Sequence, residues 1–180
     1  MNLQILPFTV EDIAALLTWN EDKGEDFLQQ WAGNGYDYPL THEQILEKIN
    51  KSERPGAECQ VYKIILAEME FTMAERSNMK ARVIGAVELN TARMPRRSAM
   101  VCRFLLDPAY QSKGYGSCAL MLLTKMAFRK LGYKMLRLKV FAFNKQAIRC
   151  YEKAGFVPCG LAEWPNGCKV VEMEIRKRLW

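Results

Sequence analysis

The segment Val101-Cys-Arg-Phe-Leu-Leu-Asp-Pro-Ala-Tyr-Gln-Ser-Lys-Gly-Tyr-Gly-Ser117 decides the fold, because it joins an apolar strand to a glycine-rich turn that opens a helix. The turn contains Gly114 and Gly116, where a backbone without Cβ atoms can approach an anion closely. The amides of the first helical turn lack partners within the helix, and Lys113 adds a positive charge. The segment therefore predicts a site for a phosphate or pyrophosphate group.

Two other nucleotide-binding patterns fit this segment less well. Gly114-x-Gly116-x-x-Ala119 matches the relaxed dinucleotide fingerprint, but that fold needs an acidic residue about 20 positions later to hold the ribose. The strand at that distance, Lys134-Met-Leu-Arg-Leu-Lys-Val140, contains no acid. A P-loop is excluded because the sequence has no Gly-Lys-Ser or Gly-Lys-Thr.

The apolar pattern on either side of this segment predicts the remaining elements. Runs rich in Val, Ile, Leu and Tyr predict strands over 3–8, 59–70, 82–89, 99–106, 135–143, 156–164 and 169–175. Capping signals and helical spacing predict helices after Thr9, over 25–31, after Thr41, over 119–127 and over 144–154, and Asn166-Gly167 predicts a hairpin turn. We expect an α/β (α+β) fold, with a mixed, mostly antiparallel sheet of about seven strands and about four helices, in a single domain over residues 1–180.

Composition narrows the class of protein. Of the 180 residues, 49% are hydrophobic and 26% charged, which excludes a disordered chain. No apolar run is long enough to cross a membrane, and no signal peptide is recognisable, so we expect a soluble, cytoplasmic protein. The six cysteines form no C-x-x-C pair and the single histidine is His42, so we expect free thiols and no metal site.

The charge is distributed unevenly along the chain. Residues 1–90 hold 8 Lys and Arg against 15 Asp and Glu, whereas residues 91–180 hold 18 against 5. A basic half suits a polyanionic ligand and an acidic half a cationic one, although such asymmetry is also common on a solvated surface.

Two motifs together resemble the GNAT N-acetyltransferase superfamily. Gln111-Ser112-Lys113-Gly114-Tyr115-Gly116 is similar to its coenzyme A motif, Gln/Arg-x-x-Gly-x-Gly/Ala. Asn144-Lys-Gln-Ala-Ile-Arg-Cys-Tyr151-Glu-Lys-Ala-Gly-Phe156 is similar to the more specific second signature, Asn-x-x-Ala-x-x-x-Tyr-x-Lys-x-Gly-Phe. Within the superfamily, the 19–31 region and the Leu-Asp-Pro strand end resemble the branch related to ribosomal-protein N-terminal acetyltransferases.

The resemblance implies that acetyl-CoA is the cosubstrate and lies where two neighbouring strands, over 101–106 and 136–143, splay apart. Backbone groups of Leu105 and Leu106 would pair with the pantetheine. The turn would hold the pyrophosphate through Gln111, Ser112, Lys113, Gly114, Tyr115, Gly116 and Ser117, and Asn144 would contact the cofactor from the second strand. The amine attacks the thioester directly in this family, so no cysteine needs to act as a nucleophile.

Tyr151 is the candidate general acid that the resemblance implies. The departing thiolate must be protonated or stabilised, and a phenol with a pKa of about 10 can donate a proton at neutral pH. The alternative is an aromatic side chain that only packs on the sheet.

The general base is less obvious. Many family members place a Glu on the strand before the glycine turn, where this chain has Arg103. Glu88 on the neighbouring strand is one alternative, and a bound water that passes the proton to solvent is another. Glu88 could equally be a solvent-facing strand residue.

The helical region near the N-terminus would wall the acceptor pocket in the resembled fold. It contains five aromatic side chains, which at helical spacing are more often core than ligand cage: Trp19, Phe27, Trp31, Tyr36 and Tyr38. Three acids lie among them, and with the acidic first half they favour an acceptor that is cationic at neutral pH: Asp22, Glu25 and Asp26.

Two other functions are weighed against an acetyltransferase. A non-catalytic acyl-CoA-binding or sensing module is the main alternative, because Arg103 replaces the usual acid. A nucleic-acid-binding domain is disfavoured, because the basic residues are assigned to cofactor-facing elements and no reading helix is recognisable. The expected partner is therefore a small-molecule or peptide amine, with no nucleic acid and no membrane, and the resemblance leaves a homodimer open.

Overall fold

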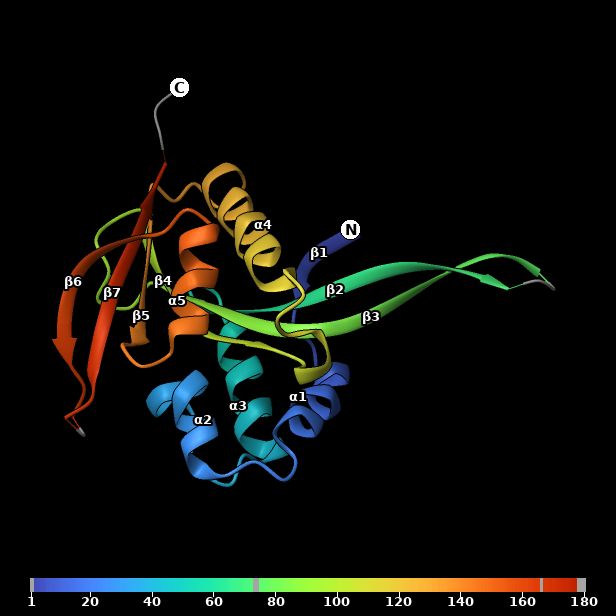
Figure 1. The fold of residues 1–180 in the computed structure, drawn as a ribbon, viewed down its shortest axis with the longest axis horizontal. Coiled ribbons are helices and arrows are strands. Elements are labelled where there is room, and N and C mark those ends of the chain that lie inside the picture. The colour runs from blue at the N-terminus through green and yellow to red at the C-terminus, as the bar shows by residue number, and fades with distance from the viewer. Residues whose placement is uncertain (1, 73–74, 166, 178–180) are drawn as a thin grey trace.

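A seven-stranded mixed sheet forms the centre of the molecule (Figure 1). The computed structural model describes residues 2–72, 75–165 and 167–177, with side chains described outside 68–80. The strands are β1 (Asn2–Pro7), β2 (Cys59–Thr72), β3 (Glu75–Asn90), β4 (Ser98–Leu106), β5 (Met135–Phe141), β6 (Val157–Glu163) and β7 (Lys169–Arg176). Their order is β1-β2-β3-β4-β5-β7-β6, and the β4–β5 pair alone is parallel. The predicted sheet is confirmed.

Helices cover both faces of the sheet. The described chain has five α-helices, one at each of the five segments where helical signals were found: α1 (Ile13–Asn20), α2 (Glu25–Ala32), α3 (His42–Ser52), α4 (Tyr115–Arg129) and α5 (Lys145–Lys153). The expected start signals are in place, since Thr9 N–H donates to Asp12 Oδ2 (2.7 Å) and Gln44 N–H donates to Thr41 Oγ1 (3.4 Å).

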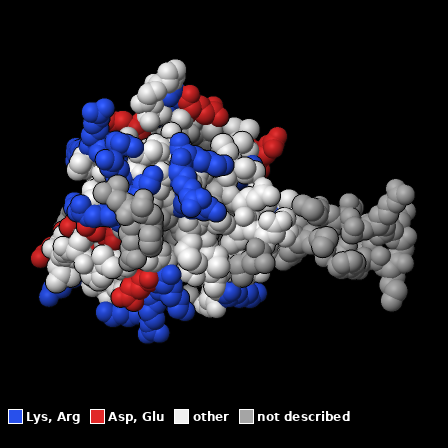
Figure 2. Space-filling view, turned by 90° about the horizontal axis from the view of Figure 1, so that it is seen from above, with Lys and Arg blue, Asp and Glu red and all other residues white. Residues whose placement is uncertain are grey.

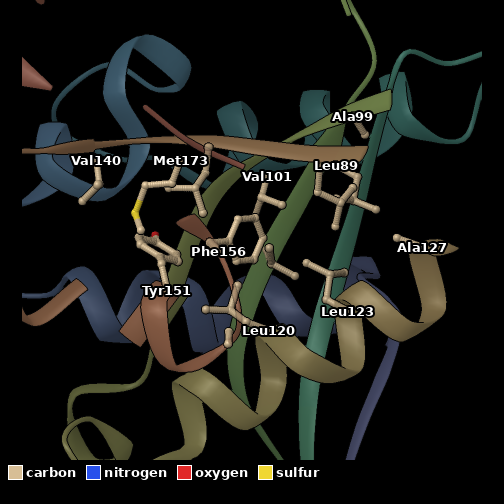
Figure 3. Close-up of a cluster of buried hydrophobic side chains, with 14 of the residues drawn as sticks. Leu89, Ala99, Val101, Leu120, Leu123, Ala127, Val140, Tyr151, Phe156 and Met173 are labelled. Carbon is tan, nitrogen blue, oxygen red and sulfur yellow. The ribbon is translucent and has the colours of Figure 1, made fainter. Parts of the chain in front are cut away.

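Strand alternation divides the core between the two faces. Val87 and Leu89 of β3 point to the face covered by α4 and α5, where they join Leu120, Leu123 and other apolar side chains (Figure 3). Ala86, which directly precedes Val87, packs with the α1 and α3 side chains on the opposite face. By the same alternation Glu88 belongs to the α1–α3 face.

The β2–β3 hairpin is longer than predicted. We expected its second strand to begin at Arg82, but β3 begins at Glu75 and the hairpin extends away from the body (Figure 1). Backbone pairing continues through Glu68 opposite Lys80 and Glu70 opposite Asn78. A ladder of backbone hydrogen bonds needs no apolar alternation, which explains why the polar stretch gave no strand signal.

The predicted β6–β7 hairpin is confirmed, although Asn166 lies outside the described residues.

The parallel strands β4 and β5 pair over a short length and then separate. Ser98, Ala99 and Met100 pair with Met135, Leu136 and Arg137, and the pairing ends there. A register shift opposite 86–88 marks a β-bulge in β4, and Arg103 within it has a φ of 50°, in the left-handed region. The splayed strand pair is therefore present and opens from residue 101 onward.

Candidate active site

A cavity of about 1040 Å³ occupies the space between the separating strands β4 and β5. Its walls come from 100–106 of β4, the turn before α4, α5, and 139–141 of β5. The second half of α2 and Trp164, before the β6–β7 turn, close the other side. The volume suits a large cosubstrate together with part of a second substrate.

The turn before α4 presents free backbone donors to this cavity. Gly114 has a φ of 85° and caps α4, and the first amide that bonds within the helix is that of Cys118, to Gly114 O (3.3 Å). The amides of Tyr115, Gly116 and Ser117 therefore have no helical acceptor. A hydrogen bond from Gln111 Nε2 to Leu106 O (2.9 Å) fixes the turn against the end of β4. Such a cradle of amides suits a pyrophosphate.

Most of the residues predicted to bind the cofactor lie on the cavity wall. These are Leu105, Leu106, Gln111, Ser112, Gly114, Gly116, Ser117 and Asn144. The two exceptions point elsewhere: Lys113 Nζ lies 5.7 Å from the centroid of the Tyr110 ring, and Tyr115 packs edge-on against the same ring at 5.7 Å. Lys113 and Tyr115 thus contribute their backbone, and not their side chains, to the cavity side of the turn.

Gly116 has a packing role that the sequence did not indicate. A Cβ at Gly116 would lie 2.8 Å from Cys150 Sγ on α5, whereas one at Gly114 would meet nothing within 4 Å. Gly116 therefore permits close contact between α4 and α5, and Gly114 permits the left-handed turn.

The turn and α5 are held together by polar side chains. Asn144 Oδ1 accepts from Ala147 N (3.1 Å) and so caps α5. Gln146 Nε2 donates to Ser112 Oγ (3.0 Å), and Ser112 itself has a φ of 61°. Sequence reasoning missed Gln146, because a glutamine at an unmarked helical position gives no signal.

Tyr151 lies on α5 with its ring among apolar side chains and on the cavity wall (Figure 3). Its ring centroid is 6.3 Å from that of Phe104 and 6.2 Å from that of Phe156, and the residue is 9% exposed. Burial raises the pKa of the Tyr151 phenol well above its ordinary value of about 10. The phenol therefore stays protonated at neutral pH and can act as a proton donor.

Glu88 is not the solvent-facing residue that the sequence left open. It is 1% exposed and does not reach the cavity wall. Its Oε1 pairs with Arg103 Nη1 and accepts from Asn90 Nδ2 (3.3 Å), and its Oε2 lies 3.8 Å from Lys48 Nζ. Burial and then the Glu88 carboxylate raise the pKa of the nearby Cys59 thiol to about 12.

Arg103 ties the bulge of β4 to the connection between α2 and α3. A Cβ at Gly35 would lie 1.8 Å from Arg103 Nε, so the guanidinium lies directly against the Gly35 backbone. Lys48 of α3 lies 5.6 Å from the centroid of the Tyr36 ring, beside this contact. The Glu88–Arg103 pair thus anchors the acceptor-side wall to the sheet.

The acceptor-side wall differs from the expectation based on charge. Phe27 and Trp31 line the cavity, and Trp31 Nε1 donates to Asn20 Oδ1 (3.0 Å), whereas Trp19 is in the core. Within the described chain, the charged residues of the cavity wall are all cations: Arg103, Lys139, Arg149 and Lys153. The three acids expected to attract the acceptor are exposed and lie outside this wall: Asp22, Glu25 and Asp26.

Residues 2–177, leaving out 166 and the side chains of 68–80, contain no cluster of three His, Cys, Asp or Glu side chains arranged to hold a metal ion. No helix over this range combines the length and apolar character that crossing a bilayer requires.

A mixed sheet with a splayed parallel pair and an amide cradle between them defines an acyl-CoA-binding fold of the acetyltransferase type. A profile of the acetyltransferase (GNAT) domain matches residues 2–157, so the chain belongs to this family. Assignment to the ribosomal-protein branch stays a prediction.

Two Bacillus subtilis (strain 168) proteins share part of the sequence. The N-acetyltransferases YycN and YdgE are 40% and 39% identical to this chain over 62 residues. These matches cover 34% of this chain and 39% of each relative, so the aligned part is about two fifths of their length.

Solved structures resemble the whole fold. Spermidine N-acetyltransferase from Vibrio cholerae, in complex with CoA and spermine, has a TM-score of 0.72 at 21% identity, covering 97% of this chain and 95% of that one. Aminoglycoside acetyltransferase AAC(6')-Ib, with paromomycin and acetyl-CoA, has a TM-score of 0.70 at 21% identity, covering 98% and 94%. At 21% sequence identity, the structural similarity shows that these proteins share the fold of this chain.

Proposed function

We propose that this protein transfers an acetyl group from acetyl-CoA to a primary amine of a small molecule or peptide, by direct attack in a ternary complex. The observation that carries the proposal is the cavity between β4 and β5, which joins free amides at one end to the Tyr151 phenol. When bound, acetyl-CoA would supply the activated acetyl thioester. The family membership and the two motifs support the same reaction.

Each part of the cavity wall then has a role. The amides of 115–117, with Gln111, Ser112, Lys113 and Gly114, would hold the pyrophosphate. The unpaired edge of β4 at Leu105 and Leu106 would bind the pantetheine, with Asn144 opposite. Tyr151 would donate its proton to the sulfur as the C–S bond breaks and the new C–N bond forms, and solvent would restore the proton.

We propose that the proton lost by the amine leaves through water. Glu88, the candidate base, is paired with Arg103 and lies behind the cavity wall, so it is suited to positioning Arg103. The acceptor would lie beside Phe27, Trp31 and Trp164. We also propose that residues 1–180 form a single domain and that the protein forms a homodimer. Light scattering tests the homodimer.

Thiol release from acetyl-CoA, with acetylated product measured by mass spectrometry, tests this function. The acceptor panel contains spermidine, an aminoglycoside, single amino acids and short peptides with free N-termini or lysines. Product with at least one acceptor is expected. Tight acetyl-CoA binding by calorimetry without product from any acceptor class would instead favour the acyl-CoA-sensing alternative, which Arg103 in place of the usual acid supports.

A further inference from the structure

A cluster of exposed basic side chains lies at the end of the molecule where α4 finishes, and the proposed acetyl transfer does not use it. Figure 2 views the molecule from that side and shows several groups of Lys and Arg on the body, with Asp and Glu in smaller groups. We call this cluster the basic end, and its exposed members are Arg93, Arg96, Arg97, Arg129, Lys130, Lys134 and Lys177.

Backbone and side-chain hydrogen bonds hold the three segments of the basic end together. Lys134 N–H donates to Arg97 O (2.7 Å), and Lys177 N–H donates to Lys134 O (2.8 Å). Arg97 Nε also donates to Gly132 O (2.9 Å). The β3–β4 turn, the α4–β5 connection and the end of β7 therefore form one fixed platform.

The positive charge of the platform is not neutralised by neighbouring acids. None of its seven cations forms an ion pair with a residue in the described parts of the chain. Glu174 of β7 is occupied by Arg137 Nη2 (3.1 Å) and Arg176 Nε (2.7 Å). Glu58 adjoins the β3–β4 turn, where Thr91 N–H donates to its backbone carbonyl oxygen (2.7 Å). Its exposed carboxylate forms no ion pair with a described residue. The local charge therefore remains strongly positive.

Two arginines of the β3–β4 turn occupy strained positions. Arg93 and Arg97 have φ angles of 58° and 62°, in the left-handed region that glycine and asparagine adopt more readily. A residue with a Cβ loses roughly 1–2 kcal/mol there. Arg97 has a structural use in its bond to Gly132, but Arg93 forms no hydrogen bond or ion pair with a described residue. An arginine that occupies such a position without a partner among the described residues points to a ligand outside the chain.

The cofactor does not account for this charge. The basic end lies at the C-terminal end of α4, and the amide cradle lies at its N-terminal end (Figure 1). Fifteen helical residues separate the two by roughly 22 Å at 1.5 Å per residue. The sequence-based expectation that the basic half serves cofactor-facing elements therefore does not extend to these seven residues. The negative end of the helix dipole can account for Arg129 and Lys130, but not for Arg93 and Arg96.

We propose that the basic end binds the phosphodiester backbone of a nucleic acid. A protein partner would require an apolar centre to the interface. Of the large apolar side chains exposed in the described chain, Leu131 alone belongs to this end, at 37% exposure. Binding to the phosphodiester backbone requires cations but no helix that reads the bases. From the sequence, a nucleic-acid-binding function is disfavoured because no such helix is recognisable, and this reason does not apply to backbone binding.

Binding of labelled 20-residue single-stranded RNA, the matching DNA duplex, and polyglutamate of similar charge tests the proposal. Fluorescence anisotropy at 50 and 200 mM salt compares the wild type with Arg93→Gln/Arg96→Gln/Lys130→Gln. The matched control carries the same charge loss at exposed sites elsewhere: Lys23→Gln, Lys51→Gln and Arg54→Gln. Urea unfolding of each variant checks that it is folded.

We expect nucleic-acid binding with a Kd of roughly 10⁻⁶–10⁻⁴ M that weakens with salt. The basic-end variant should lose about 10-fold or more at low salt, and its salt slope for RNA should fall by about 2, at about 0.7 per phosphate contact. The control should bind like the wild type, and a preference between RNA and duplex DNA identifies the source of the phosphates. The proposal would be overturned if both variants lost the same affinity or if no binding occurred at 50 mM salt. It would also be overturned if polyglutamate bound as tightly as RNA, and that result would favour an acidic protein as the partner.

Discussion

The cofactor side and the acceptor side of the cavity are built in different ways. The cofactor side comes from two short segments, 105–117 and 144–151, whose local hydrogen bonds set their shape. The acceptor side depends on Glu88 of β3, Arg103 of β4, Lys48 of α3 and the backbone of Gly35. The comparison teaches that local backbone geometry shapes the proposed cosubstrate side, whereas a buried ion pair between distant elements shapes the proposed acceptor side.

The largest effect should come from breaking that ion pair. Glu88→Leu leaves the largely buried Arg103 guanidinium without its carboxylate partner, so the free energy of unfolding should fall by about 3–5 kcal/mol. Urea unfolding measures the loss. Coenzyme A affinity at low temperature, measured by calorimetry, should stay at the wild-type value while the protein is folded, because the cofactor side does not use Glu88.

The double variant Glu88→Leu/Arg103→Met distinguishes the cost of an unpaired charge from the anchoring role of the ion pair. Replacing both partners by apolar side chains removes the buried charge, so most of the lost stability should return. The KM for the amine should remain raised, because the guanidinium no longer holds the Gly35 backbone. A double variant as unstable as the single one would show that the unpaired guanidinium is not the cause of the loss, and a wild-type KM would contradict the anchoring role.

The next largest effect concerns Tyr151 on the cofactor side. Tyr151→Phe should lower kcat by roughly 10- to 1,000-fold, since a lost general acid acts on the transition state. Coenzyme A affinity should change little. Tyr133→Phe, on a tyrosine outside the cavity wall, is the matched control. Full kcat in Tyr151→Phe would assign that ring to packing.

Substitutions at the two glycines should separate packing from the amide cradle. Gly116→Ser places a Cβ 2.8 Å from Cys150 Sγ, so stability should fall by about 1–3 kcal/mol. Gly114→Ser meets open space but keeps a left-handed φ, so a loss of about 1–2 kcal/mol and weaker coenzyme A binding are expected. Gly24→Ser, at an open helix cap, is the control. Equal effects at Gly116 and Gly24 would contradict the packing assignment.

The smallest effect is a shift in pH dependence. The protonated phenol is the active form of Tyr151, and burial raises its pKa. The active form therefore persists to higher pH, and kcat should not fall as the pH rises from 8 to 10, although an ordinary tyrosine with a pKa of about 10 would be half deprotonated at pH 10. Steady-state rates at saturating amine test this, and a half-maximal rate at pH 10 would contradict it.

The sequence alone determined the cofactor side, because its signals are local. The glycine turn after an apolar strand, the cap at Asn144 and the spacing to Tyr151 lie within single elements or their connections, where dihedral preferences and helix periodicity act. The seven strands followed from the same kind of pattern, except where β3 extends through a polar stretch that backbone pairing alone holds.

Tertiary structure decided the acceptor side and the place of the charges. From the sequence, Glu88 could be a base or a surface residue, until the β-bulge brought Arg103 to it and alternation placed it under α3. The acids at 22, 25 and 26 were expected beside the acceptor but lie outside the cavity wall, and seven basic residues gather far from the cofactor turn. Sequence fixes how many charges each segment carries, but ion pairing and burial depend on which distant segments the sheet brings together.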